Sequence, residues 1–275
     1  MFTKKSCLYL SLLLLASPLE LAFGSQPFVK ADSVVQAPAG NSQTLPNTTL
    51  IRFQSPPNDG QPKEGTASGG TRGSCPQDAN RSSYLTLLLP RSQEGLTVAE
   101  HPIFFAYVPQ TQANTGEFFL YDRTQKTLIY QTRFPLTNIP GIVSIQYPTN
   151  KPRLEIDKSY QWRFLLRCKS DDRAVDAYKI GWIKRIAQPE AVARVRNSTN
   201  PSERAQVYAE NGIWYDTLKI IAEQKPRVSA NSTATIMWRQ LLQSESVKLD
   251  DIVSSPLVEC CKPSNWKFCL VHSFG

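Results

Sequence analysis

Between residues 84 and 186 the sequence is a series of short β-type runs separated by turn-forming residues. The clearest run begins at Ser159, where SYQWRFLLRC alternates aromatic or apolar side chains with mostly polar ones. Alternate side chains of a strand point to opposite faces. One face of this strand should therefore be aromatic and buried, and the other largely charged and wet.

Six further runs have similar lengths, and prolines, glycines or aspartates stand between them as turn formers. The expected strands cover residues 84–89, 103–108, 117–122, 128–134, 141–147, 159–168 and 176–186. No helical spacing occurs between them. The pattern predicts an antiparallel, immunoglobulin-like β-sandwich of about seven strands within residues 75–187.

Helical spacing begins after this region, within residues 199–244. Asn200 is a suitable N-cap and Pro201 a suitable first helical residue, while Asn211 and Gly212 end the first helix. A second helix is expected over 214–224 and a third over 233–243. The first two resemble one tetratricopeptide hairpin, but a single repeat does not form a stable solenoid. The hairpin is expected to pack on the sandwich or on a partner, which makes the fold mainly β with a C-terminal α part.

The remaining segments carry less pattern. Residues 1–24 combine Lys4 and Lys5 with a short apolar run and small residues, as in a secretory signal peptide. Residues 25–74 are rich in proline, serine and glycine and are expected to form a disordered linker. Residues 245–275 are expected to form an irregular, cysteine-containing tail. The chain is therefore expected to be exported, to the periplasm or the extracellular space, without a transmembrane segment.

The formal net charge is +8, but the basic residues are scattered along the expected strands rather than massed in one run. A basic excess can favour anionic partners such as acidic glycans, nucleic acid or membrane surfaces. Export argues against nucleic acid. A generally basic, solvated surface is the preferred interpretation.

Five of the six cysteines follow the expected signal peptide, and an exported protein can keep disulfides. Cys75 precedes the first strand and Cys168 ends the sixth on its inner face, which makes them a candidate pair. The roles of Cys260, Cys261 and Cys269 stay open. No spacing resembles a metal or redox motif, and no metal or cofactor is expected.

Catalytic patterns are largely missing from the sequence. His101 and His272 are the only histidines, and no GxSxG, P-loop, GxGxxG or HExxH motif occurs. Glu155 and Asp157 form a carboxylate pair, as a glycosidase would need, but neighbours at a strand entrance are usually solvated. The charged loop at residues 171–176 departs from the calcium-loop pattern and favours surface ion pairs. No catalytic residue is therefore assigned.

His101 follows Glu100 and precedes Pro102, which disfavours helical backbone at His101. Adjacent side chains of an extended chain point apart, so Glu100 and His101 do not form a catalytic pair. His101 stays a weak candidate for an interaction site. Three aromatic residues are weak candidates as ligand-stacking rings: Tyr121, Tyr147 and Trp182.

Several segments occur in an order that resembles a known family. They are RGSCP (72–76), LTVAEHPIFFAYVP (96–109), EFFLYD (117–122), PGIVSI (140–145), DRAVD (172–176), GWIKRI (181–186) and YAENGIWYD (208–216). Together with the Tyr160–Trp162–Cys168 strand, they resemble the domain of unknown function 928 family, which is secreted and found mainly in cyanobacteria. The resemblance implies export and a shared fold, and no activity.

These features favour an exported, non-catalytic interaction or scaffolding protein of the cell envelope. Its partner would be another envelope protein or an acidic glycan. A glycan-binding module is the first alternative and predicts exposed aromatic rings along one groove. A carboxylate-dependent hydrolase is the second and predicts facing acids in a cleft. The oligomeric state stays open.

Overall fold

The structure is a computed structural model that describes residues 51–56, 75, 84–124, 126–136, 140–169, 171–225 and 232–258. These residues belong to the compact unit Leu45–Gly275. The described residues exclude the expected signal peptide, residues 25–50 and 57–74 of the expected linker, and the tail from residue 259 with Cys260, Cys261, Cys269 and His272.

The described residues form eight strands in two sheets, with helices following them in the sequence. The strands are β1 (Thr86–Leu87), β2 (Glu94–Thr97), β3 (Ile103–Val108), β4 (Thr115–Asp122), β5 (Leu128–Pro135), β6 (Gly141–Gln146), β7 (Ser159–Leu166) and β8 (Ala177–Arg185). Each of the seven expected runs overlaps a strand, which confirms a mainly β fold with a C-terminal α part.

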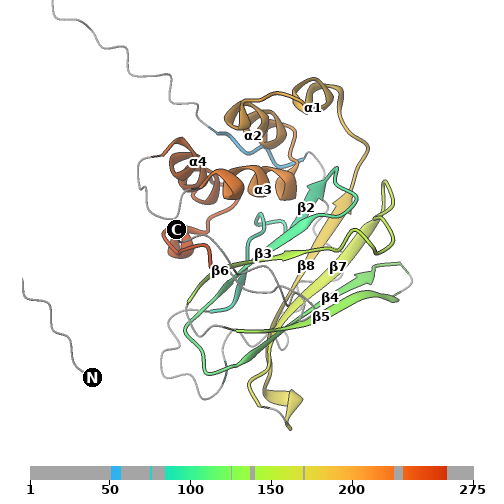
Figure 1. Cartoon of the computed structure of the whole chain (residues 1–275), viewed down its shortest axis with the longest axis vertical. Coiled ribbons are helices and arrows are strands. Elements are labelled where there is room, and N and C mark those ends of the chain that lie inside the picture. Colours follow the sequence, from blue (N-terminus) through green and yellow to red (C-terminus); the bar gives the residue numbers. More distant parts are fainter. Residues whose placement is uncertain are drawn as a thin grey trace, which may run out of the picture. The chain divides into compact units, whose positions relative to one another are not determined.

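One sheet has the order β1-β3-β6 and the other β2-β8-β7-β4-β5 (Figure 1). The expectation of purely antiparallel pairing is wrong in one place, because β2 pairs with β8 in parallel. Strand β2 was not predicted; it has only four residues and contains Gly95. Packing explains why a glycine stands at this position, because a β-carbon on residue 95 would lie 2.7 Å from Cε2 of Tyr215.

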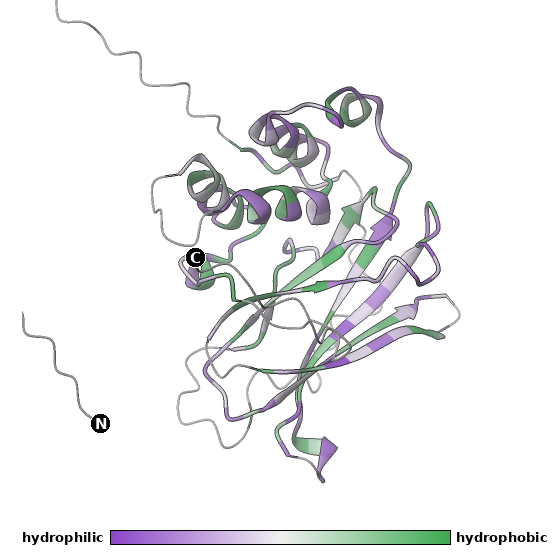
Figure 2. Cartoon of the chain, viewed as in Figure 1, coloured by the Kyte–Doolittle hydropathy of each residue, from purple (hydrophilic) through white to green (hydrophobic). Residues whose placement is uncertain are grey.

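Aromatic side chains fill the space between the sheets. Phe104 of β3 lies with its ring centroid 4.9 Å from that of Phe118 in β4 and 5.0 Å from that of Trp162 in β7. Along β7 every second residue is buried and the residues between are half-buried, as the alternation predicts. Figure 2 shows the corresponding mixture of hydrophobic and hydrophilic residues along the strands of this sheet.

The helices of the described part are α1 (Glu190–Val195), α2 (Pro201–Glu210), α3 (Trp214–Gln224) and α4 (Thr233–Leu242), with short 3-10 turns η1 (Arg173–Val175) and η2 (Asp250–Ile252). Asn200 caps α2 as expected, since its side chain accepts hydrogen bonds from the backbone of Ser202 and Glu203. Gly212 has a φ of +70°, which favours glycine, and separates α2 from α3. The short helix α1 was not predicted.

The helices gather at one end of the sheets, next to β2 and β3 (Figure 1), and α3 joins them to the β core. Trp214 Nε1 donates a 2.8 Å hydrogen bond to the Leu88 carbonyl. Tyr215 donates to the Trp182 carbonyl at 2.9 Å and accepts from Trp162 Nε1 at 2.8 Å. The predicted hairpin thus packs on the sheets and shares their core.

Residues 51–56, expected to belong to a disordered linker, instead pack on the helices. Ile51 and Phe53 are both only 6% exposed, and the Phe53 ring meets that of Trp214 edge-on at 4.9 Å. The backbone N–H of Gln54 donates to the Ala209 carbonyl at 3.1 Å. The expectation is wrong here because two apolar residues in a polar stretch suffice to dock it onto a distant helix pair.

The start of the expected irregular tail is also ordered by contacts with the domain. Val247 and Ile252 are buried. Ile142 in β6 donates to the Pro256 carbonyl and accepts from the backbone N–H of Val258, at 2.8 and 2.9 Å. The bridge Ile142–Leu257 is parallel, so this end of the described chain pairs with the edge of β6.

Candidate functional site

His101 and Tyr147, two of the weak candidates for an interaction site, lie together and away from the sheet surfaces. Tyr147 has no exposed surface, and its hydroxyl donates a 2.6 Å hydrogen bond to the Pro152 carbonyl. Burial raises the pKa of Tyr147 to about 12. The His101 ring stacks on it with centroids 5.4 Å apart and has Nε2 2.9 Å from the Lys151 carbonyl oxygen. Tyr147 is thus part of the core, not a ring that a ligand can reach.

Glu100 makes its contacts with arginines rather than with the neighbouring histidine. Its Oε1 lies 3.2 Å from Arg153 and 3.4 Å from Arg185. Hydrogen bonding by Arg153, with the charges of both arginines, lowers the pKa of Glu100 despite the opposing effect of desolvation. The contacts of Glu100 and His101 therefore stabilise the local structure at the entrance of β3.

The other two candidates, Tyr121 and Trp182, lie on one face of the five-stranded sheet. Tyr121 pairs with Gln161, and Gln161 pairs with Trp182, so all three point to the same side. We call this side, which is opposite the buried core, the outer face; it is defined by Glu117, Phe119, Tyr121, Gln161, Arg163 and Trp182. Trp182 is only 8% exposed, whereas Tyr121 is half-buried.

Arg163 lies at the centre of the outer face, where it pairs with Phe119 across β4 and β7. Its guanidinium carbon lies 5.1 Å from the centroid of the Tyr121 ring. Gln161 holds the guanidinium, since its Oε1 accepts from Nε at 3.2 Å and from NH2 at 3.0 Å. The Phe119 and Tyr121 rings are stacked at 6.3 Å. Arg163 and Phe119 were not among the predicted candidates, although the alternation in β7 already put Arg163 on its charged side.

A second cluster occupies the end of the outer face near β5 and η1. Glu117 is buried, with its side chain 4% exposed, and its Oε1 lies 2.7 Å from Arg133 and 3.4 Å from Arg167. Its Oε2 lies 2.9 Å from Arg173. Burial raises the pKa of Glu117, but hydrogen bonds and charge from Arg173 and Arg133 outweigh it, so the pKa lies below its ordinary value.

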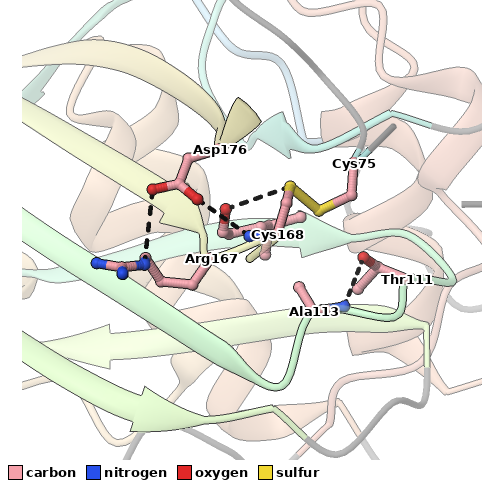
Figure 3. Close-up of a disulfide and its surroundings, with 7 residues drawn as sticks. Cys75, Thr111, Ala113, Arg167, Cys168 and Asp176 are labelled. Carbon is pink, nitrogen blue, oxygen red and sulfur yellow. Dashed lines mark hydrogen bonds and ion pairs between the residues drawn. A yellow bond between two sulfur atoms is a disulfide. The ribbon is translucent and has the colours of Figure 1, made fainter. Parts of the chain in front are cut away.

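The disulfide lies near this cluster (Figure 3). Cys75 and Cys168 are bridged, with Cα atoms 5.3 Å apart, which confirms the predicted pair. The backbone N–H of Cys168 donates to Asp176 Oδ1 at 3.0 Å, and Asp176 Oδ2 lies 3.6 Å from Arg167 Nε. The bridge and the Asp176 contacts together fix both ends of the loop at residues 168–176.

Of the two carboxylates considered for catalysis, Glu155 lies in an ion pair, and the backbone N–H of Asp157 donates to the Arg185 carbonyl at 2.7 Å. Lys158 lies 2.7 Å from Asp122 and 2.8 Å from Glu155, and hydrogen bonds to these two carboxylates raise its pKa despite the opposing effect of desolvation. Asp172 accepts from the Ala174 backbone at 2.9 Å and caps η1. Within the described ranges, no group of three or more histidine, cysteine or acidic residues could hold a metal ion.

The comparisons with known proteins point to a single family. The family model described as Domain of Unknown Function (DUF928) matches residues 67–257. A search of curated proteins gave no match. In the part of the chain that the structure describes, no helix has the length and apolar character needed to cross a membrane.

Proposed function

The chain belongs to the DUF928 family, and we propose that it is a non-catalytic binding protein whose contact surface is the outer face. The observation that carries this proposal is the outward cluster of Phe119, Tyr121 and Arg163, which combines half-buried rings with a cation. Aromatic residues and arginine are enriched at protein interfaces. Phe119, Tyr121 and Arg163 are all half-buried, so part of each side chain is open to contact.

Four acidic side chains of the β domain are held in structural contacts. Glu117 is held by arginines, Asp122 and Glu155 by Lys158, and Asp176 by Arg167 and the Cys168 backbone. General acid–base work needs a carboxyl group whose proton can reach a substrate. Groups fixed in ion pairs and capping contacts supply architecture instead, which supports binding over hydrolysis.

For the architecture we propose an immunoglobulin-like sandwich. Support comes from the two facing sheets and from Tyr160, which lies near the start of β7. The Tyr160 hydroxyl accepts a 2.8 Å hydrogen bond from the backbone N–H of Glu155, five residues upstream. Immunoglobulin-like domains have a tyrosine in a comparable corner. Because such folds host many functions, the proposed binding function is based on the residues of the outer face and not on the fold.

We further propose that the protein is exported and acts in the cell envelope. The signal-like pattern of residues 1–24 supports export. The Cys75–Cys168 bridge also supports it, because structural disulfides persist in oxidising compartments. An envelope protein is then the natural partner.

Site-directed photo-crosslinking tests the proposed surface. A photoreactive residue at Gln131, which is exposed on the outer face beside Phe119, should form an adduct in envelope extracts. The matched control is Ser144, which is exposed on β6 in the other sheet. Adducts specific to position 131 would support the proposal. Equal adducts at both positions, or none at either, would refute it.

A further inference from the structure

Arg163 differs from the other arginines near the outer face in the groups that contact its guanidinium. Arg133, Arg167 and Arg173 all lie within ion-pairing distance of Glu117. Arg163 is held only by the neutral amide of Gln161 and by the Tyr121 ring, and no carboxylate of the described residues forms an ion pair with it. Its guanidinium therefore presents a positive charge that an incoming carboxylate can meet.

Three of the side chains around Arg163 are apolar. Its neighbours across the strands are Phe119 in β4 and Ile180 in β8, and Leu165 follows it on the same side of β7. All three are half-buried. A partner that covers them removes apolar surface from water and desolvates the guanidinium, which strengthens its attraction for a carboxylate.

A second copy of the chain using the same face is disfavoured. Glu117 on the outer face and Glu94, which pairs with Trp182 across β2 and β8, have side chains only 4% and 13% exposed and are already paired with arginines. Arg133, by contrast, is 66% exposed. Two such faces would bring positive charges together, and like charges oppose association.

A glycan is also disfavoured, because the rings do not offer a free platform. Phe119 stacks on Tyr121, and the Arg163 guanidinium lies over the Tyr121 ring. A sugar would have to displace these contacts before it could stack. The mixture of aliphatic, aromatic and arginine side chains matches the composition of protein interface cores.

We propose that the outer face binds an acidic protein surface, whose carboxylate pairs with Arg163 while its apolar side chains cover Phe119, Leu165 and Ile180. This inference rests on the proposed function and adds the chemistry of the partner. Charge complementarity of this kind sets specificity and speeds association, so binding should weaken as salt concentration rises.

The photo-crosslinker at Gln131 provides the test, now combined with a second substitution in the full chain. Arg163→Gln should lower the adduct yield in envelope extracts by at least about tenfold, as expected for a central interface arginine. Lys219→Gln on α3 removes the same charge from a partly exposed, remote site and should leave the yield unchanged. Thermal unfolding followed by circular dichroism checks that both variants fold.

The outcomes separate the two proposals. A peptide adduct rich in aspartate and glutamate, lost in Arg163→Gln, supports the inference. A protein adduct that survives Arg163→Gln overturns it and leaves the proposed function standing. An adduct to carbohydrate, or to a second copy of the chain, overturns the choice of partner. No adduct at all overturns both.

Discussion

Phe53 lies in a polar segment, yet its contact with Trp214 predicts that residues 51–56 are part of the folded domain. The ring is 6% exposed and meets Trp214 edge-on at 4.9 Å. Burial of a phenylalanine contributes about 1.5–3 kcal/mol, and an aromatic pair adds about 0.5–1.5 kcal/mol. Phe53→Ala should therefore lower the free energy of unfolding by about 3 kcal/mol.

Urea denaturation of the full chain measures this change. Arg52→Ala is the matched control, because Arg52 is exposed in the same segment and its loss should cost less than about 0.5 kcal/mol. A chain that begins after residue 56 should lose at least as much stability as Phe53→Ala, because it also lacks the buried side chain of Ile51. If Phe53→Ala and Arg52→Ala have the same free energy of unfolding, the segment does not stabilise the domain and the reasoning is refuted.

Three further variants test other parts of the fold. Replacing Cys75 and Cys168 by serine should lower the free energy of unfolding by about 4–5 kcal/mol, because the bridge spans a sequence separation of 93 residues; a reductant that destabilises the variant as much as the wild type would contradict this. Glu117 has a folded pKa below its ordinary value of 4.5, so its stabilising contribution is present above that pH and is lost as the pH falls through the folded pKa. Glu117→Gln should therefore be less stable at neutral pH and lose less stability on acidification, as measured by urea midpoints at several pH values; parallel pH profiles would refute the role of the arginines. Gly95→Ala places a β-carbon 2.7 Å from Tyr215 and should lower the free energy of unfolding by about 1–3 kcal/mol, as measured by thermal unfolding. An unchanged midpoint would show that α3 shifts easily to make room for the added methyl group.

The strands were predictable where local alternation was strong. In β7 the period of two placed Trp162 inward and Arg163 outward, and the structure has both. β2 escaped prediction because Gly95 is explained only by Trp214 and Tyr215, which lie more than a hundred residues later in the sequence. Phe53 was missed for the same reason, since its partner Trp214 is even more distant along the chain.

The candidate site was predictable in part. The sequence singled out Tyr121 and Trp182 as aromatic candidates, but only the strand register shows that they share one face. The convergence of three arginines on Glu117 joins β4, β5, η1 and the residue after β7, and only the folded arrangement brings these residues together. Tyr147 was expected as a surface candidate, but its side chain lies against Tyr130 in the core, with ring centroids 5.6 Å apart.

Covalent footprinting is the most direct test of the outer face as the contact surface. Hydroxyl radicals oxidise accessible side chains, and the chain can be compared alone and after incubation with envelope extract. Oxidation of Phe119 and Tyr121 should fall in the extract, while that of Tyr84 and Ile156, which are 53% and 51% exposed, should stay the same. Unchanged oxidation of Phe119 and Tyr121, with protection at Tyr84 or Ile156 instead, would contradict the account.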